Sequence, residues 1–566
     1  MIITFTPQNI KYHANLGENL LSVAALAGVF VDGTCGGKGI CGKCKVKVLS
    51  GDLEPIKTHE IGFLTKTEVL NGYRLACKIF IESDMDIELP ITNHATCRKT
   101  KLNYLPDDFL PEVKEKYGVA YDIGTTTVVA MLWNLKTGEL LEAVAQTNPQ
   151  SIYGADVISR INFCGEKPEN LKQIQKKIID CMNELAVELF EKAEVKAEDI
   201  SEMVAVGNTT MSHLLLGIDP GSLARAPFEP AFNGSRSVDA SELGLLEGKG
   251  SGGLELYILP NIAGHVGSDI VAGILSSRLR ELVGTNLSID IGTNGEVALF
   301  HEGKTLVCST AAGPAFEGAS IKHGMRAASG AIEAVSYKDG KILLDTIDDK
   351  APVGICGSGL IDAVALLLET GVIDKKGKML DKEAAEAANM KANIVKRMRK
   401  IDGINEFVIA FGGGDAGREA GRDAGSEAGG DAGNEAGRNA VAPPDIVITQ
   451  KDVREVQLAK GAIQAGITCL LNLAGITSKD IDRVILAGAF GNYINKKSAL
   501  RIGMLPQLPL EKIVSVGNAA GSGASMALLS LRERAAASKI AETAIHVELS
   551  TEPGFQDEFL KSMYFI

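Results

Sequence analysis

The first 92 residues show short apolar segments whose pattern predicts a small β-rich unit. Apolar residues at helical spacing over residues 18–29 predict one helix that ends at Gly28. A loop rich in glycine and cysteine follows at residues 32–44. Alternation of apolar and polar positions predicts four strands, at residues 1–7, 8–15, 45–49 and 85–90.

A different pattern begins at Tyr117 and returns at Asn286. Each time the chain reads as a strand, a tight Gly/Thr turn and a second strand. Residues 120–132 align without gaps with residues 288–300, and both segments contain Asp-Ile-Gly-Thr. An amphipathic helix is expected between the copies, over residues 170–193. The repeat predicts two lobes that are built from the same hairpin-first unit.

Two polar stretches interrupt these patterns. Residues 93–116 contain two prolines and predict a linker between domains. Residues 414–437 are six tetrapeptides of the form x-[Asp/Glu]-Ala-Gly. Glycine at every fourth position disfavours a helix, and no side chain there is bulky enough to pack. We expect a flexible, solvated insertion over residues 412–440, without a functional role.

Composition excludes several classes of protein. The 566 residues include 58 Lys and Arg against 71 Asp and Glu, a formal charge of −13, which disfavours a general nucleic-acid binder. The longest largely apolar run, Leu20–Val31, is too short to span a bilayer, which takes about 20 residues. The first residues lack the charged and apolar blocks of a secretory signal. We therefore expect a cytoplasmic protein without membrane association, whose cysteines are ligands, nucleophiles or core residues before they are disulfides.

Four cysteines have the spacing of an iron–sulfur site, C-x5-C-x2-C-x32-C. Four thiolates can hold a [2Fe–2S] cluster, and glycines beside them let backbone N–H groups approach the sulfides. A structural zinc site also accepts four cysteines but more often pairs two short C-x2-C segments, so the spacing favours the cluster. The predicted ligands are Cys35, Cys41, Cys44 and Cys77, and the glycines are Gly33, Gly36, Gly37, Gly39 and Gly42. Cys97 lies outside the motif, and ordinary burial is expected for Cys164, Cys181, Cys308, Cys356 and Cys469.

The two repeated turns offer groups that suit a magnesium nucleotide. Asp122 and Asp290 each end a strand, where a carboxylate can hold hydrated Mg²⁺. Gly124 and Gly292 let a phosphate approach the backbone, and hydroxyl and N–H groups of the turns can donate to phosphate oxygens. The predicted donors are Thr125, Thr126 and Thr127 in the first turn and Thr293, Asn294 and Gly295 in the second.

These segments resemble two known families. The cysteine spacing and the preceding strands and helix resemble the β-grasp [2Fe–2S] ferredoxins, and are closer to the adrenodoxin-like branch than to the plant branch. The paired turns resemble the superfamily of acetate and sugar kinases, Hsp70 and actin, in which two RNase-H-like lobes clamp ATP. This second resemblance implies that Leu486–Asn492, with Gly488 and Gly491, flanks adenosine, and that Val206–Thr210 ends an interlobe connection.

The implied fold class is multidomain, with an α+β ferredoxin domain followed by α/β duplicated ATPase lobes. The domain boundaries that we predict are 1–92 for the ferredoxin domain, 93–116 for the linker, 117–285 for a middle domain or first lobe and 286–566 for the C-terminal lobe.

The combination of an electron carrier and an ATP-driven clamp narrows the function. ATP is needed when the acceptor is harder to reduce than the donor, and each ~100 mV of deficit costs about 2.3 kcal/mol per electron. The whole architecture resembles the reductive activators of corrinoid-dependent methyltransferases. The resemblance implies ATP-dependent reduction of a Co(II) corrinoid to Co(I) in a methyltransferase or O-demethylase system, with a corrinoid protein and a cellular electron donor as partners, in a homodimer. Our hypothesis for the mechanism is that the linker lets the ferredoxin domain move between those partners.

Two other functions stay open at this point. The first is a small-molecule kinase with a fused ferredoxin as redox sensor, although no acid/base carboxylate beside a substrate pocket is identifiable in the sequence. The second is an electron-transfer protein whose C-terminal region is a nucleotide-gated docking module.

Overall fold

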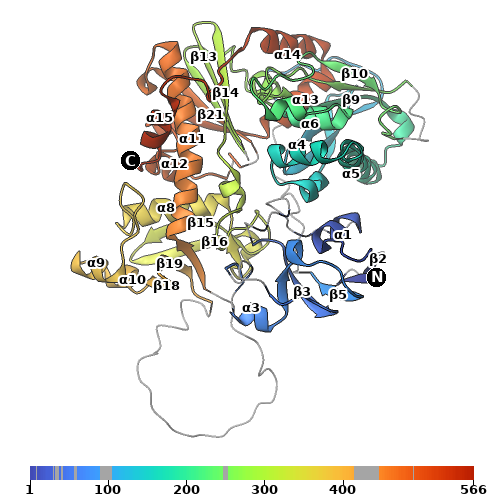
Figure 1. Ribbon diagram of the computed structural model, residues 1–566. Coiled ribbons are helices and arrows are strands. Elements are labelled where there is room, and N and C mark those ends of the chain that lie inside the picture. The colour runs from blue at the N-terminus through green and yellow to red at the C-terminus, as the bar shows by residue number, and fades with distance from the viewer. Residues whose placement is uncertain are drawn as a thin grey trace. The chain divides into compact units, whose positions relative to one another are not determined.

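The computed structural model describes the chain except at residues 8, 28, 30, 32–36, 38, 40, 41, 57–59, 61, 65, 90–104, 247–252, 293, 413–444, 489 and 492. Its helices and strands are labelled in Figure 1. The chain divides into two compact units. One contains Met1–Thr310, Gly466–Asn492 and Glu511–Pro553, and the other contains Ala311–Ala465, Tyr493–Leu510 and Gly554–Ile566.

The N-terminal part of the first unit is a five-stranded mixed sheet with the order β2-β1-β5-β3-β4. Its strands are β1 (Ile2–Thr6), β2 (Ile10–His13), β3 (Lys45–Ser50), β4 (Tyr73–Leu75) and β5 (Met85–Glu88). Helix α1 (Leu20–Leu26) begins at Asn19, whose side chain accepts the N–H of Leu21, and it buries Leu20 and Val23 against Phe5 of the sheet. The four predicted strands and the helix are confirmed. The short strand β4 and helix α3 (Lys66–Leu70) were not expected.

Two six-stranded sheets share the arrangement of five strands, which confirms the duplicated lobes, and their sixth strands lie at opposite edges. In each, three antiparallel strands come first, and two later strands add in parallel beside the first of them. The first sheet has the order β10-β11-β9-β6-β7-β8 and contains β6 (Tyr117–Ile123), β7 (Thr127–Asn134), β8 (Glu139–Thr147), β9 (Ile200–Gly207), β10 (Arg236–Asp239) and β11 (Glu255–Ile258). The second has the order β22-β21-β12-β13-β14-β23 and contains β12 (Asn286–Ile291), β13 (Gly295–His301), β14 (Lys304–Thr310), β21 (Arg483–Ala487), β22 (Ile513–Gly517) and β23 (Ile545–His546).

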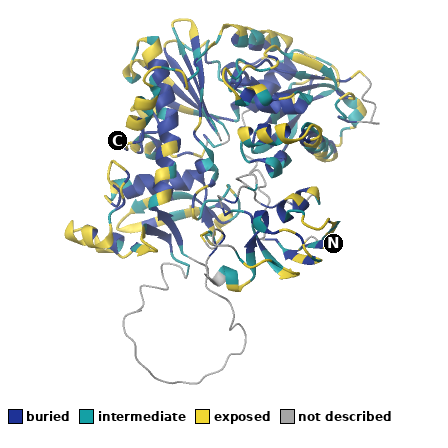
Figure 2. Ribbon diagram, viewed as in Figure 1, coloured by how far each residue is buried: buried dark blue, intermediate teal, exposed yellow. Residues whose placement is uncertain are grey.

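Helices cover both faces of the first sheet, whose central strands β6, β7 and β9 are largely buried (Figure 2). Alternate residues of β6 face opposite sides, so Val119 and Tyr121 belong to a core with α5, whereas Ala120 belongs to a core with α7 and α13. The helices of this lobe are α4 (Val157–Glu166), α5 (Asn170–Ala193), α6 (Thr209–Leu216), α7 (Ser268–Ser276), α13 (Ala519–Leu529) and α14 (Leu531–Thr543). The predicted helix over 170–193 is confirmed.

Helix α13 comes from the last tenth of the chain but packs on the first lobe. A Cβ placed on Gly118 of β6 would lie 2.9 Å from Leu528 Cδ1, so glycine permits this close packing. Residues 105–116 pack beside α13. Phe109 is buried in the same core as this helix, and the Glu112 carboxylate accepts a 2.8 Å hydrogen bond from Ser530 Oγ. The rest of the predicted linker, at 93–104, lies outside the described residues.

The second unit contains two three-stranded sheets, ordered β16-β15-β17 and β18-β19-β20. Their strands are β15 (Ala331–Lys338), β16 (Lys341–Thr346), β17 (Gly354–Ile355), β18 (Met398–Ile401), β19 (Ile404–Ala410) and β20 (Ile446–Thr449). The remaining helices are α8 (Gly357–Glu369), α9 (Lys382–Ala387), α10 (Ala392–Val395), α11 (Gln450–Ala474), α12 (Lys496–Arg501) and α15 (Phe555–Ser562).

The residues that flank the tetrapeptide repeat are joined to each other. The Gly412 N–H donates to Asp445 Oδ1 at 2.9 Å, and Arg399 Nη1 lies 2.7 Å from Asp445 Oδ2. The repeat itself lies outside the described residues. Across the described part of the chain, no helix combines the length and apolar character that crossing a bilayer requires.

Candidate functional site

Two of the predicted cluster ligands lie side by side at the end of a strand pair. Cys44 precedes β3, and Cys77 follows β4 in the short helix η1 (Ala76–Lys78). The strands pair with Lys45 opposite Leu75, and the Ala76 N–H donates to the Cys44 carbonyl at 2.8 Å. Both cysteines are buried, and Asn19 Nδ2 donates to the Cys77 carbonyl at 3.0 Å. Two buried cysteines on neighbouring segments fit half of a four-thiolate cluster site.

The other two predicted ligands, Cys35 and Cys41, lie outside the described residues, as do Gly33 and Gly36. The described glycines of the loop, Gly37, Gly39 and Gly42, all have positive φ, from 68° to 79°. A Cβ on Gly42 would also lie 2.6 Å from the Phe63 ring. The loop therefore needs glycine for its backbone path and its packing, in addition to access for N–H groups. The five cysteines predicted to be ordinary buried residues are all buried.

The first turn is held by two asparagines from distant strands. Asn518 Nδ2 donates to Asp122 Oδ2 at 2.8 Å, and Asn208 Nδ2 donates to Thr125 Oγ1 at 2.9 Å. Each asparagine also caps a helix with its Oδ1, α13 for Asn518 and α6 for Asn208. Both end a Val-Gly-Asn triplet after a parallel strand. We did not assign either residue from the sequence, although the repeated triplet was a usable signal.

The carbonyl groups of the first turn face the interior of the lobe. Asn148 Nδ2 donates to the Gly124 carbonyl at 2.8 Å, and Arg160 Nη2 donates to the Thr125 carbonyl at 2.5 Å. In a trans peptide the N–H points opposite to the C=O, so the N–H groups of Thr125 and Thr126 point away from these donors. Successive N–H groups on one side of a turn form a concavity that binds anions.

The second turn places Asp290 next to groups from both neighbouring strands. Asp290 is paired with Glu296 on β13 and with Ala487 on β21. A Cβ on Gly488 would lie 2.5 Å from Asp290 Oδ1, so this glycine backbone lies against the carboxylate. Glycine is also needed at Gly491, where a Cβ would lie 2.5 Å from the Ala487 carbonyl oxygen.

The rest of the second turn is closed by hydrogen bonds. The Gly292 N–H donates to the Asn294 carbonyl at 3.0 Å, and Thr310 Oγ1 donates to the Gly295 carbonyl at 2.8 Å. Thr293 lies outside the described residues.

Four carboxyl groups interact here, and we call Asp122, Asp269, Asp290 and Glu296 the acidic cluster. Burial raises the pKa of Asp122 to about 6, and the hydrogen bond from Asn518 opposes this rise. Burial and then repulsion from other members raise the pKa of Asp269 and of Asp290 to about 7. The same causes raise the pKa of Glu296 well above its usual range. A divalent cation would relieve this repulsion.

Asp269 and Glu296 were missed by sequence reasoning. Asp269 lies in the first turn of α7, and Glu296 follows the second turn directly. Within the described residues no three His, Cys, Asp or Glu side chains are close enough to hold a metal ion by themselves. Mg²⁺ usually keeps several waters and binds one or two carboxylates together with phosphate oxygens.

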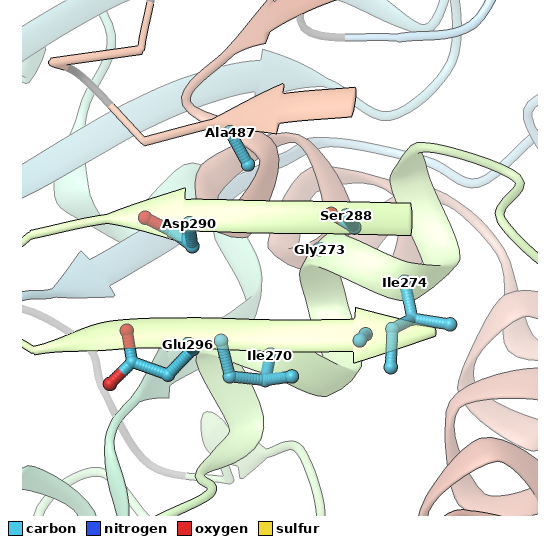
Figure 3. Close-up of a pocket in the computed structure, with 8 residues that line it drawn as sticks. Ile270, Gly273, Ile274, Ser288, Asp290, Glu296 and Ala487 are labelled. Atoms are coloured by element: carbon cyan, nitrogen blue, oxygen red, sulfur yellow. The ribbon is translucent and has the colours of Figure 1, made fainter. Parts of the chain in front are cut away.

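A small cavity lies behind two members of the acidic cluster. Its volume is about 10 Å³, which is room for about one water molecule. Figure 3 shows Asp290 and Glu296 on neighbouring strands, with their carboxyl oxygens toward the same end of the strands. The other lining residues are mostly small or apolar and are Ile270, Gly273, Ile274, Ser288, Ala298 and Ala487. These residues keep water away from one side of Asp290 and Glu296, and so contribute to the burial that raises the pKa of both carboxyl groups.

Family models of known proteins match three parts of the chain. Family models match for the 2Fe-2S iron-sulfur cluster binding domain over residues 3–82, the RACo middle region over 117–282 and the C-terminal ASKHA domain of RACo over 284–413 and 433–566. The corrinoid activation enzyme RamQ of Eubacterium limosum is 34% identical, over 97% of this chain and 96% of its own. The chain belongs to the family of reductive activators of corrinoid proteins.

Further relatives of this activator support the assignment. The [Co(II) methylated amine-specific corrinoid protein] reductase of Methanosarcina barkeri is 27% identical over 78% of this chain and 76% of its own. A solved structure, the reductive activator for corrinoid, iron-sulfur protein, is 32% identical with a TM-score of 0.67, and covers 100% of this chain and 98% of its own. The family resemblance and the multidomain fold class predicted from the sequence are confirmed.

Proposed function

We propose that this activator uses ATP to drive a one-electron reduction of a partner corrinoid protein, from inactive Co(II) to active Co(I). The observation that supports it most is that similarity to RamQ extends over 97% of the chain, and so includes both the cysteine site and the acidic cluster. The corrinoid is the substrate: cobalt gains one electron, and the iron–sulfur site of this chain loses one.

For the electron-transfer site we propose Cys35, Cys41, Cys44 and Cys77 as ligands. When bound, the [2Fe–2S] cluster supplies single electrons. The chain holds Cys44 and Cys77 in place through the β3–β4 pairing and through the Asn19 hydrogen bond to the Cys77 carbonyl. Burial of both thiols limits access of water to the site.

For the nucleotide site we propose that the acidic cluster binds hydrated Mg²⁺ and orients the attacking water through Asp122 and Asp290. MgATP, when bound, supplies the free energy for the uphill electron transfer. The N–H groups of the first turn would donate to phosphate oxygens, because its carbonyl groups accept hydrogen bonds from Asn148 and Arg160 on the opposite side. The proposed contacts are Gly124, Thr125, Thr126, Thr127, Gly292, Thr293, Asn294 and Gly295 for phosphate, with Gly488 and Gly491 toward adenosine.

We also propose that the activator acts as a homodimer, accepts electrons from a cellular reductant and has domain boundaries near residues 92, 116 and 285. Closure of the lobes on nucleotide would favour one conformation of the docked corrinoid protein, and this differential binding would make its cobalt easier to reduce.

An anaerobic assay with two variants tests the proposal. The protein is mixed with a reductant and a Co(II) corrinoid protein, and the cobalt spectrum is followed with and without MgATP. Cys77→Ser should lose cobalt reduction and keep ATP hydrolysis, whereas Asp290→Ala should lose hydrolysis and keep a reducible cluster. Cys164→Ser, at another buried cysteine, is the matched control and should behave as wild type.

Two results would favour the other functions. Cobalt reduction that is unaffected by removing ATP would favour an electron-transfer protein with a docking module. ATP turnover that is stimulated by a small metabolite, without cobalt reduction, would favour a kinase.

A further inference from the structure

A fully buried arginine supports the first turn from behind. Arg160, on α4, is 0% exposed, which is rare for an arginine. Its guanidinium donates to four acceptors: Nη2 to the Thr125 carbonyl at 2.5 Å, Nε to the Gly154 carbonyl at 2.9 Å, and Nη1 to Gln150 Oε1 at 3.4 Å and to Met211 Sδ at 3.3 Å. The planar fork of an arginine therefore joins the turn to the chain that leads into α4.

The local sequence explains how this arginine reaches the turn. Helix α4 begins after Asp156, whose carboxylate accepts the Ser159 N–H at 2.7 Å. A Cβ on Gly154 would lie 2.5 Å from Ser159 Cβ, so only glycine lets the incoming chain pass this close to the helix. The Gly154 carbonyl is thereby brought within reach of Arg160 Nε.

We propose that Arg160 is a positioning residue for triphosphate binding, because it fixes the peptide between Thr125 and Thr126 with its N–H toward the phosphates. This inference rests on the proposed nucleotide site. A peptide rotated by half a turn would present its carbonyl oxygen to the anion instead. The hydrogen bond from a cationic donor to the Thr125 carbonyl opposes that rotation and is about twice as strong as one between neutral groups.

Contacts made by other residues hold the rest of the turn, so the role of Arg160 is to orient one peptide and not to support the fold in general. Asn148 holds the carbonyls on both sides, that of Gly124 through Nδ2 and that of Thr126 through its backbone N–H, each at 2.8 Å. Asn208 holds the Thr125 hydroxyl. Without Arg160 the turn therefore keeps its path, and the peptide after Thr125 loses this carbonyl contact.

The test compares ligands with and without phosphates. Dissociation constants of a non-hydrolysable MgATP analogue and of adenosine are measured by calorimetry for wild type, Arg160→Met and Arg160→Lys. For Arg160→Met we expect about ten- to hundredfold weaker binding of the ATP analogue, the equivalent of one lost hydrogen bond from a charged group, with adenosine affinity unchanged. Arg160→Lys restores the charge and one donor, and should recover part of the triphosphate affinity even if the Met variant does not fold.

A matched control isolates the effect of lost stability. Asn170→Ala removes a different buried hydrogen bond of the same lobe, from Asn170 Nδ2 to the Phe163 carbonyl at 2.7 Å, and should leave the ratio of ATP to adenosine affinity unchanged. If the folded Arg160 variants weaken both ligands equally, or neither, the inference is wrong and the proposed function stands. If wild type itself does not bind the ATP analogue, both are wrong.

Discussion

Replacing Asp290 by asparagine should make the nucleotide-free protein more stable at high pH while ATP hydrolysis is lost. Asparagine keeps the size of the side chain and removes one negative charge from the acidic cluster. Burial and the Asp122 carboxylate raise the pKa of Asp290 to about 7, so the folded protein holds a proton there that the unfolded chain releases near its ordinary pKa. The stabilisation from this bound proton is present at acidic pH and is lost as the pH rises to about 7.

The pairing of Asp290 with Glu296 in the sheet allows the expected gain in the free energy of unfolding to be estimated. Asp290 and Glu296 are opposite each other on β12 and β13, a geometry that places Cβ atoms about 5 Å apart. Two full charges about 6 Å apart repel by about 3 kcal/mol at an effective dielectric constant of about 20, which is an upper limit because the same repulsion raises the pKa of Glu296. Asp290 is half-buried, and water on its exposed side reduces the repulsion. We therefore expect a gain of about 1–2 kcal/mol for Asp290→Asn at pH 8, a smaller gain at pH 5 and almost none below the ordinary aspartate pKa near 3.8.

Thermal unfolding in EDTA without nucleotide measures this difference. Asp290 lies in the first unit, whose size of about 380 residues makes a gain of 1 kcal/mol correspond to about 1–2 °C. Asp107→Asn, at an exposed position, is the control and should shift the melting temperature equally little at both pH values. A variant that melts at or below the wild-type temperature at pH 8, with normal behaviour at pH 5, would show that the four carboxyl groups do not repel one another.

Four further outcomes follow from the described contacts. Mn²⁺ affinity, titrated by electron paramagnetic resonance, should rise between pH 5.5 and 7.5 as the acidic cluster loses protons; a flat profile would contradict the raised pKa values. Asn518→Leu removes a hydrogen bond that lowers the pKa of Asp122, so the acid limb of the ATP hydrolysis profile should move to higher pH. Gly42→Ala, at φ 68°, should lower bound iron and acid-labile sulfide, whereas unchanged content would argue against the loop packing. Replacing residues 413–444 with a short Gly/Ser link should leave the melting temperature and ATP hydrolysis unchanged.

The parts that could be predicted from the sequence are those with a short local signature. The strand–turn–strand repeat is visible because each copy occupies 13 consecutive residues, and the shared sheet topology confirms it. The C-x5-C-x2-C spacing that ends at Cys44 is equally local. Both patterns can be recognised before the fold is known, because each depends on residues that are close together in the sequence.

The missed residues act over long sequence separations. Asp122 receives its hydrogen bond from a residue 396 positions away, and no period or spacing predicts such a pair. Asp269 comes from a helix that only the fold places near the second turn. Gly488 was predicted to contact adenosine, and that role stays a prediction. Its backbone lies against Asp290, a neighbour that only the parallel pairing of β21 with β12 supplies.

The packing of α13 on the first lobe has a consequence for biosynthesis. Leu528 and its neighbours complete a core whose other wall, around Ala120, is translated some 400 residues earlier. A ribosome adds about 5–20 residues per second, so the apolar surface around Ala120 stays exposed for on the order of half a minute before α13 is synthesised. Nascent chains halted near residue 285 should therefore need chaperone protection, and the two halves made as separate polypeptides should become soluble only when they are produced together.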